Sequence, residues 1–342
     1  MRHPRHFHRL SARQVVRAAS IAAVLLAVGV AGPTGAASLD DATVATPAPR
    51  VVATIKPLHS LVAGVMAGVA EPVLLVRGGV SPHDYALRPS DARALGAAEI
   101  VFWIGPGVET FLEKPLAALA GGDGAANAFT MVALDDIRLL SLRRGGLWPA
   151  EAETTEAHDP HLWLDPENGR AMVEAIAATL ARHDPAHAAA YAANAARMTG
   201  ELAALDRALA ARLRPVKDIP YVVYHDAFRY FEARYGLAAI GSISTGPDRA
   251  PGARRLHEIR RRIVDGGAVC VFTEPQFRPR IVATLIEDTA ARVGVLDPIG
   301  SDIPPGPGAY AALLTALAEG LVACLSPTAA SIQPPPSTRP PS

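Results

Sequence analysis

Short apolar runs alternate with amphipathic stretches along the first part of the chain. The runs have the length of buried strands, and the stretches repeat apolar residues at helical spacing. Strand followed by helix, repeated, predicts a parallel sheet covered by helices. The expected strands are 51–55, 73–76 and 100–104, and the expected helices are 58–68, 90–97 and 108–119.

The same alternation returns in the last third of the chain and predicts a second lobe. The expected fold class is therefore α/β, with two lobes of parallel sheet flanked by helices, the N-terminal lobe at 51–166 and the C-terminal lobe at 215–325. In the second lobe the expected strands are 221–224, 237–243, 269–273 and 293–296, and the expected helices are 227–235, 252–264, 278–291 and 309–324.

Residues 167–214, between the lobes, are rich in alanine and show no strand pattern. Asp165 followed by Pro166 suits the N-cap and first position of a helix, and Pro185 suits a restart after a break at 183–184. A helix of about 28 residues would span roughly 42 Å at 1.5 Å per residue. We expect these residues to form a long rigid helix that joins the lobes; two ordinary helices of a helical subdomain are the alternative.

The two ends of the chain differ from the rest. Residues 1–37 place five arginines before an apolar run and small residues after it, the pattern of a secretory signal peptide. The run holds about 14 residues, fewer than the roughly 20 of a membrane-spanning helix, so export is expected rather than a membrane anchor. Residues 38–50 form a polar lead, and residues 326–342, with six prolines, are expected to be disordered.

Composition narrows the classes of function. The 342 residues are 50% hydrophobic and carry 33 basic and 33 acidic side chains, so two medium cores can form without a dominant surface charge. A nucleic-acid partner is not expected, because such proteins usually carry a basic excess. After export the only two cysteines, Cys270 and Cys324, would meet an oxidising compartment, which predicts a disulfide; two separate buried thiols are the alternative.

Three of the histidines hold positions that suit a metal site. His83 and His225 each follow a predicted strand, and ligands bind outside the carboxyl ends of parallel strands. His161 comes just before the linking helices, at the junction of the lobes. Three neutral imidazoles with one oxygen complete a tetrahedral zinc site. The fourth donor is expected to be Glu274, Asp297 or a water molecule.

Seven segments carry a resemblance to the ZnuA-type zinc-binding subunits of bacterial ABC importers, within the metal-binding solute-binding proteins. The resemblance covers about residues 50–325. The matching motifs are IKPLHS at 55–60, PHDY at 82–85, LRPSD at 87–91, PHLWL at 160–164, YHDAF at 224–228, the segment 252–259, and EPQF at 274–277.

The resemblance implies a metal held between the lobes by the counterparts of His83, His161 and His225. Manganese-binding relatives tend to carry a glutamate where His225 stands, and nitrogen donors favour zinc. A disulfide between the two cysteines matches one in the zinc branch. The implied function is high-affinity capture of Zn²⁺ in the periplasm and its delivery to an inner-membrane ABC permease and its ATPase, by a monomer that is not an enzyme.

The chain departs from the family pattern at two places. Some zinc members carry a glutamate before the first ligand histidine, where this chain has Pro82, which cannot coordinate through its side chain. Many also have a long loop rich in His and Asp before the second ligand. Here residues 143–159 offer only His158 and a few acidic residues, and an ordinary solvated loop is expected. We do not expect His59, His183, His187 and His257 to bind the metal directly.

A zinc hydrolase is the alternative function, because three histidines with an open fourth position are also the arrangement of catalytic zinc. The chain lacks a His-Glu-x-x-His motif and a general base at motif spacing, which argues against hydrolysis. A surface adhesin with a structural metal is a second alternative, which the neutral net charge disfavours.

Overall fold

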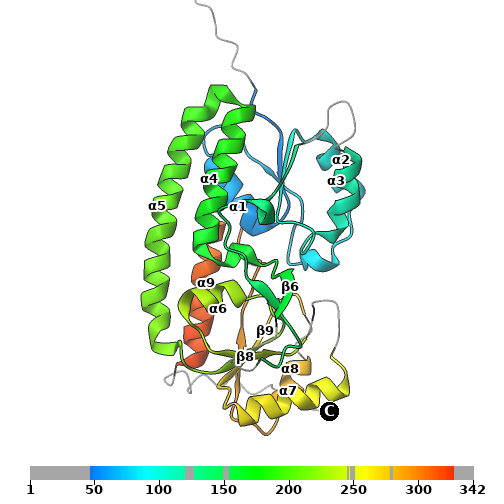
Figure 1. Cartoon of the computed structure of the whole chain (residues 1–342), viewed down its shortest axis with the longest axis vertical. Coiled ribbons are helices and arrows are strands. Elements are labelled where there is room, and N and C mark those ends of the chain that lie inside the picture. Colours follow the sequence, from blue (N-terminus) through cyan, green and yellow to red (C-terminus); the bar gives the residue numbers. More distant parts are fainter. Residues whose placement is uncertain are drawn as a thin grey trace, which may run out of the picture. The chain divides into compact units, whose positions relative to one another are not determined.

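Two four-stranded parallel sheets organise the part of the chain that the computed structural model describes, residues 47–119, 127–148, 154–244, 246, 251–277 and 280–326. The predicted signal peptide and nearly all of the predicted tail lie outside the described residues. The expected α/β fold, with two lobes of parallel sheet flanked by helices and joined by a long helix, is confirmed (Figure 1). The residue boundaries of the lobes stay a prediction.

The N-terminal sheet has the strand order β2-β1-β3-β4, and its neighbouring strands are parallel. Val52 and Val101 face a cluster that includes residues of α2 and α3, whereas Val51 and Phe102 face the main core and α1. Helices on both faces explain why β1 and β3 are apolar throughout. The elements are β1 (Val51–Ala53), α1 (Lys56–Val65), β2 (Val73–Leu74), α2 (Pro89–Ala97), β3 (Ile100–Trp103), α3 (Glu113–Leu119) and β4 (Asn127–Thr130).

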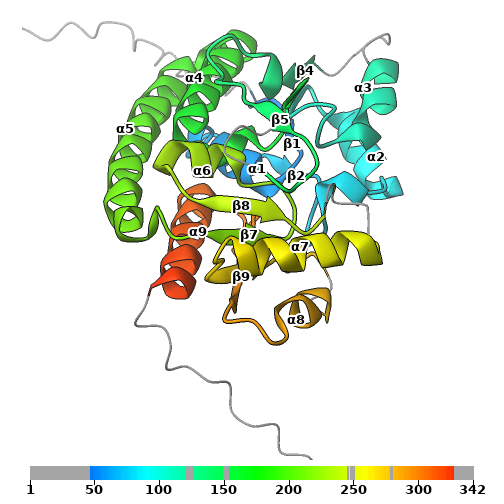
Figure 2. The same cartoon turned by 60° about the horizontal axis from the view of Figure 1, so that its bottom comes forward.

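The C-terminal sheet has the order β10-β9-β7-β8, again parallel. Val222 and Val271 pack with apolar residues of α7 and α8, and Val223 and Phe272 pack in the main core with α9 (Figure 2). The elements are β7 (Tyr221–Val223), α6 (Arg229–Tyr235), β8 (Ala239–Ser242), α7 (Ala253–Asp265), β9 (Cys270–Thr273), α8 (Arg280–Ile286), β10 (Arg292–Val295) and α9 (Ala309–Leu325).

A disulfide joins Cys270, at the start of β9, to Cys324, in the last turn of α9. The α9 helix packs against β10, and Gly294 of that strand leaves room for it: a Cβ there would lie 2.4 Å from a ring carbon of Phe272 and 3.1 Å from the Cβ of Cys324. The predicted disulfide is confirmed, and it fixes the last helix to the C-terminal sheet.

Two long helices follow the N-terminal lobe. The side chain of Asp165 accepts a hydrogen bond from the Glu167 amide at the start of α4 (Pro166–His183), as the N-cap prediction requires. After a short break, α5 (Ala188–Leu213) runs for 26 residues, which is about 39 Å at 1.5 Å per residue. It packs along α4 and also contacts α1 and α9, so that it touches helices of both lobes (Figure 1). The prediction of a long helix that joins the lobes is confirmed.

Two features differ from the predictions. No strand was expected at β4, and residues 143–159 were expected to form a solvated loop. Instead, β5 (Ser141–Arg143) pairs antiparallel with β6 (Thr154–His158), while residues 149–153 lie outside the described residues. The strands β5 and β6 are short and partly polar, so their sequences lack the apolar pattern by which a strand is predicted. Short 3₁₀ turns occur at Pro82–Asp84, Thr110–Leu112, Met131–Ala133, Leu162–Leu164, Pro185–His187 and Arg214–Val216.

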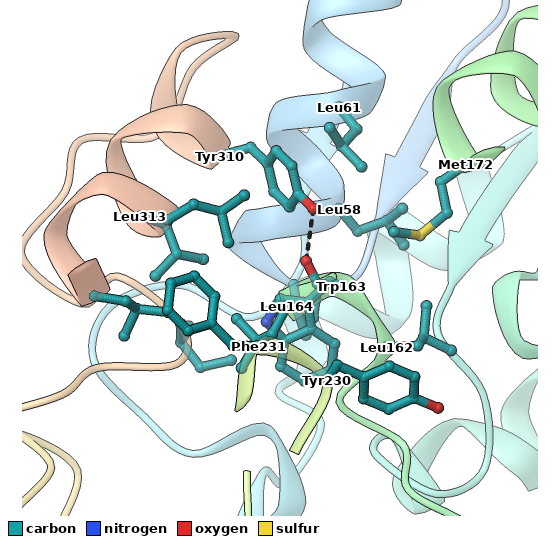
Figure 3. Packing of buried hydrophobic residues seen from close by; sticks show 14 of the residues in the cluster. Leu58, Leu61, Leu162, Trp163, Leu164, Met172, Tyr230, Phe231, Tyr310 and Leu313 are labelled. Carbon is teal, nitrogen blue, oxygen red and sulfur yellow. Dashed lines mark hydrogen bonds between the residues drawn. The ribbon is translucent and has the colours of Figure 1, made fainter. Parts of the chain in front are cut away.

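The main core continues from one lobe to the other. Figure 3 shows side chains of α1, α4, α6 and α9 packed around the turn Leu162–Leu164. The Tyr310 hydroxyl donates to the Trp163 carbonyl oxygen at 2.6 Å, and the Trp163 indole donates to the Pro298 carbonyl oxygen at 2.8 Å. Among the described residues, no helix is both long enough and apolar enough to cross a membrane.

Candidate metal centre

His83 lies in the 3₁₀ turn Pro82–Asp84, which follows β2. The hydroxyl of Ser81 accepts a hydrogen bond from the His83 amide at 3.3 Å, and Pro82 occupies the first position of the turn. Proline has a fixed φ that suits the start of a helical turn. This local structure directs a partly exposed imidazole toward the other two histidines.

His161 follows β6 and is held by the carboxylate two residues before it. Asp159 Oδ1 accepts hydrogen bonds from the His161 amide and from its ring Nδ1, both at 2.9 Å. Asp159 is fully buried and His161 is 5% exposed. With Nδ1 bound to a carboxylate, the proton resides on Nδ1 and the Nε2 lone pair is available for a metal.

His225 follows β7 and has an equivalent partner from the next strand of the sheet. Glu274, directly after β9, accepts from the His225 ring Nδ1 at 2.6 Å and from its amide at 3.2 Å, both at Oε1. The parallel register of β7 and β9 places the two residues at the same edge of the sheet. Two of the three rings therefore present Nε2 away from a carboxylate and toward a shared point.

The three Nε2 atoms converge. His161 Nε2 lies 3.2 Å from His83 Nε2 and 3.4 Å from His225 Nε2, and the donor atoms of all three rings lie within 4.8 Å of one another. Zinc–nitrogen bonds of about 2.0–2.1 Å at tetrahedral angles separate two nitrogens by about 3.3 Å. The spacing of these nitrogens therefore fits ligands of one tetrahedral zinc ion.

The protonation of the two buried rings differs. Burial, aided by the positive charge of His225, lowers the pKa of His161 to about 3. Burial also acts to lower the pKa of His225, but the charge and the hydrogen bond of Glu274 outweigh it and raise the pKa. Burial raises the pKa of Glu274 itself. His161 is therefore neutral near pH 7, the form that a metal needs.

The two predicted carboxylate donors occupy different places. Glu274 lines the space between the histidines, but its Oε1 is bound to His225. Asp297 lies outside that lining and accepts from the amides of Ile299 and Gly300, both at 3.0 Å, and from the Gln276 side chain at 2.7 Å. Among the described residues, the group with mutually close donor atoms consists of the three histidines without a carboxylate.

The remaining described histidines lie elsewhere. His59 is buried in α1, where its Nε2 lies 3.1 Å from the Pro72 carbonyl oxygen, and His187 binds Asp184 through Nδ1 at 2.7 Å. His158, His183 and His257 are exposed. Asp159 was not predicted from the sequence as the partner of His161. The two-residue spacing in Asp-Pro-His was the only available signal.

The space between the three rings is small. The cavity there has a volume of about 10 Å³. Trp163, Phe277, Pro298 and Ile299 form much of the apolar wall. Such a space is of the size that holds a single ion or water molecule.

The fold and the site together define a class of protein, a metal-binding solute-binding protein with two α/β lobes joined by a long helix. Comparisons with known proteins narrow this class. The family model described as ZnuA, "Zinc-uptake complex component A periplasmic", matches residues 51–324. The chain therefore belongs to the ZnuA family.

Individual relatives agree with this assignment. The chain is 44% identical over 311 residues to the "High-affinity zinc uptake system protein ZnuA" of Brucella suis biovar 1, covering 81% of this chain and 91% of that protein. It is 38% identical over 305 residues to the protein of the same name from Paracoccus denitrificans, covering 81% and 92%. A crystal structure of ZnuA superimposes with a TM-score of 0.69 at 26% identity, covering 82% of this chain and all of that one.

Proposed function

We propose that this chain captures a zinc ion with the Nε2 atoms of His83, His161 and His225. The spacing of these atoms carries the proposal, because 3.2 and 3.4 Å are the separations that one tetrahedral zinc ion requires. Nitrogen donors favour zinc over manganese, which prefers oxygen. The carboxylates of Asp159 and Glu274 support the site by fixing the orientation of two rings.

A water molecule is the fourth donor in this proposal. Neither Glu274 nor Asp297 belongs to the group of described residues whose donor atoms all lie within 4.8 Å of one another, Asp297 caps the turn that follows it, and Pro82 has no donor atom in its side chain. An open fourth position also occurs in catalytic zinc sites. Hydrolysis is nevertheless disfavoured, because the chain has no His-Glu-x-x-His motif and the named relatives belong to zinc uptake systems.

The membership of the ZnuA family supports a role in transport. The named relatives belong to high-affinity zinc uptake systems, and the family model describes a periplasmic component. We infer that this chain is exported by a signal peptide at residues 1–37 and acts in the periplasm as a monomer. It then delivers zinc to an inner-membrane ABC permease driven by its ATPase. The lobes at 51–166 and 215–325 would enclose the ion between them.

Elemental analysis tests the capture step. The mature protein is purified from the periplasm without added metal, beside the His161→Ala variant prepared in the same way. We expect close to one equivalent of zinc in the parental protein and far less in the variant. Manganese or iron as the main metal, or equal zinc in both preparations, would overturn the proposal.

A further inference from the structure

The β5–β6 hairpin connects the N-terminal lobe to the C-terminal sheet. Gly146, between the two strands, has a positive φ of 66°, and its carbonyl oxygen accepts from the Ser242 amide of β8 at 2.8 Å. A Cβ at Gly146 would lie 2.6 Å from the Ser242 hydroxyl, so glycine is needed for this approach. Arg262 of α7 also donates to the Trp148 carbonyl oxygen at 2.5 Å. The hairpin thus covers the edge strand of the C-terminal sheet.

Arg143, at the end of β5, connects the hairpin to two carboxylates of the C-terminal lobe. Its Nε donates to Asp226 Oδ2 at 2.9 Å, and its terminal nitrogen donates to Asp226 Oδ1 and, at 2.8 Å, to Glu232 Oε2. The guanidinium carbon lies 3.5 Å from the centre of the Trp148 ring. The side chains of Arg143, Asp226 and Glu232 are 13%, 15% and 5% exposed. A planar guanidinium fork suits this arrangement, because it binds both oxygens of one carboxylate and has further N–H groups for a second.

Arg143 is joined to two of the proposed zinc ligands by short paths. Asp226 is the residue after His225, so the guanidinium fixes the backbone beside that ligand. On the other side, the Leu140 carbonyl oxygen, just before β5, accepts from the Asp159 amide at 2.8 Å, and Asp159 holds the His161 ring. Tyr230 bridges the same two residues: its hydroxyl donates to the Asp159 carbonyl oxygen at 2.9 Å and accepts from the Leu140 amide at 3.0 Å.

We propose that Arg143 is a positioning residue of the zinc site, which sets the geometry of His161 relative to His225 by fixing the hairpin to Asp226 and Glu232. The inference rests on the proposed zinc function. It concerns a side chain that touches neither the ion nor a ligand ring. Arg143 supplies the rigid link between the loop that carries one ligand and the strand end that carries another.

Replacement of Arg143 tests this role. Arg143→Gln removes both the charge and the fork, and Arg143→Lys keeps the charge but cannot bind two carboxylates in the same way. Arg234→Gln is the matched control, since Arg234 forms a similar forked pair with Asp206 of α5, through Nε at 3.0 Å. Zinc affinity is measured by competition with a chelator, the visible absorption of bound Co²⁺ reports ligand geometry, and thermal melting of the metal-free proteins reports stability.

The expected results separate positioning from general stability. Arg143→Gln should weaken zinc binding by about 10–100-fold, the range for residues that orient ligands, and should alter the Co²⁺ spectrum. Arg143→Lys should change both in the same direction, whereas Arg234→Gln should lower the melting temperature and keep the affinity and spectrum of the parental protein.

Three outcomes would overturn the proposal: zinc affinity within twofold of the parental value with an unchanged Co²⁺ spectrum, full recovery in Arg143→Lys, or an equal loss in Arg234→Gln. If Arg143→Gln does not fold, Arg143→Lys decides by the same criteria. The parental protein is titrated first. If it fails to bind zinc, the proposed function fails, whereas normal parental binding with unaffected Arg143 variants refutes only the role of Arg143.

Discussion

At two of the three histidines, the ring nitrogen that faces away from the cluster is bound to a buried carboxylate. Asp159 fixes His161, and Glu274 fixes His225. Each carboxylate also accepts from the amide of the histidine that it orients, so ring and backbone are held together. The ring therefore needs little reorganisation when an ion arrives, which favours tight binding.

Removal of one of the three proposed ligands should weaken zinc binding far more than removal of a histidine elsewhere. We expect zinc binding to weaken by more than about 100-fold in each of the variants His83→Ala, His161→Ala and His225→Ala. A loss of roughly 100-fold is the upper end for residues that only orient a metal ligand. His187→Ala and His257→Ala are the controls, and their affinity should stay within about twofold of the parental value, the scatter expected of a change that touches no ligand. Chelator competition measures all five proteins. Similar losses across the set would contradict the ligand assignment.

The pH dependence of zinc affinity follows from the unequal protonation of two rings. Since burial first, and the charge of His225 second, lower the pKa of His161 to about 3, this ring stays neutral from pH 5 to 8 and releases no proton when zinc binds. The pKa of His225 is raised, because Glu274 outweighs the effect of burial. Protons therefore compete with zinc at His225 at a higher pH than at an ordinary histidine.

We expect the affinity to be nearly constant at alkaline pH and to fall as the pH drops below the pKa of His225. Fewer than three protons should be released for each zinc ion bound. Chelator competition between pH 5 and 9 gives the curve, and calorimetry in buffers of different ionisation enthalpy gives the number of protons. An affinity that does not change over this range would refute histidine ligation.

The three histidines could be predicted from the sequence because each has a local signal. His83 and His225 follow apolar runs, and His161 precedes a helix with a clear N-cap. The positions of Glu274 and Arg143 depend instead on the register of separate strands and on the docking of a hairpin. No local pattern specifies those contacts. The same limit left Glu274, Asp297 and water as equal candidates for the fourth donor.

Among the strands, the sequence predicted those that are buried on both faces and also the edge strands β2, β8 and β10, but it missed β4, β5 and β6. The strands β1, β3, β7 and β9 are continuous apolar runs because helices cover both sides of each sheet. In contrast, β4 is an edge strand that begins with exposed residues, and β5 is only partly buried. Tertiary context determines such strands, and propensity alone predicts them poorly.

The disulfide between β9 and α9 should stabilise the fold. Cys270 and Cys324 close a loop with a sequence separation of 54 residues. The chain-entropy model assigns about 4 kcal/mol to a loop of this length, as an upper value. We expect the Cys270→Ala/Cys324→Ala variant to lose up to that amount in urea unfolding. The oxidised parental protein should show no free thiol after denaturation; two free thiols, or equal stability of the two proteins, would argue against a stabilising bridge.

The two lobes are tied together by polar contacts as well as by the shared core. Lys56, at the start of α1, donates from Nζ to the carbonyl oxygens of Gly300, Ser301 and Ile303, at 2.5, 2.8 and 2.9 Å. This loop follows Asp297 and belongs to the C-terminal lobe. Trp163, beside His161, adds its hydrogen bond to Pro298. The three histidines therefore lie where the segments of both lobes are already joined.

An ion shared by such segments should stabilise the whole molecule. Zinc binds the folded state, in which three distant histidines are brought together, and the unfolded chain has no preformed site. Mass action then adds about 4 kcal/mol to the free energy of unfolding when free zinc exceeds the dissociation constant a thousandfold. For a chain of this size we expect the melting temperature to rise on the order of 10 °C.

Scanning calorimetry at one heating rate, with zinc or with excess chelator, measures this shift. The His161→Ala variant is the control, and it should melt at nearly the same temperature in both conditions. Because a site confined to one lobe would stabilise only that lobe, a two-step transition in which zinc moves a single step would show that the ion does not join the lobes. A parental melting temperature that is indifferent to chelator would exclude the three-histidine site altogether.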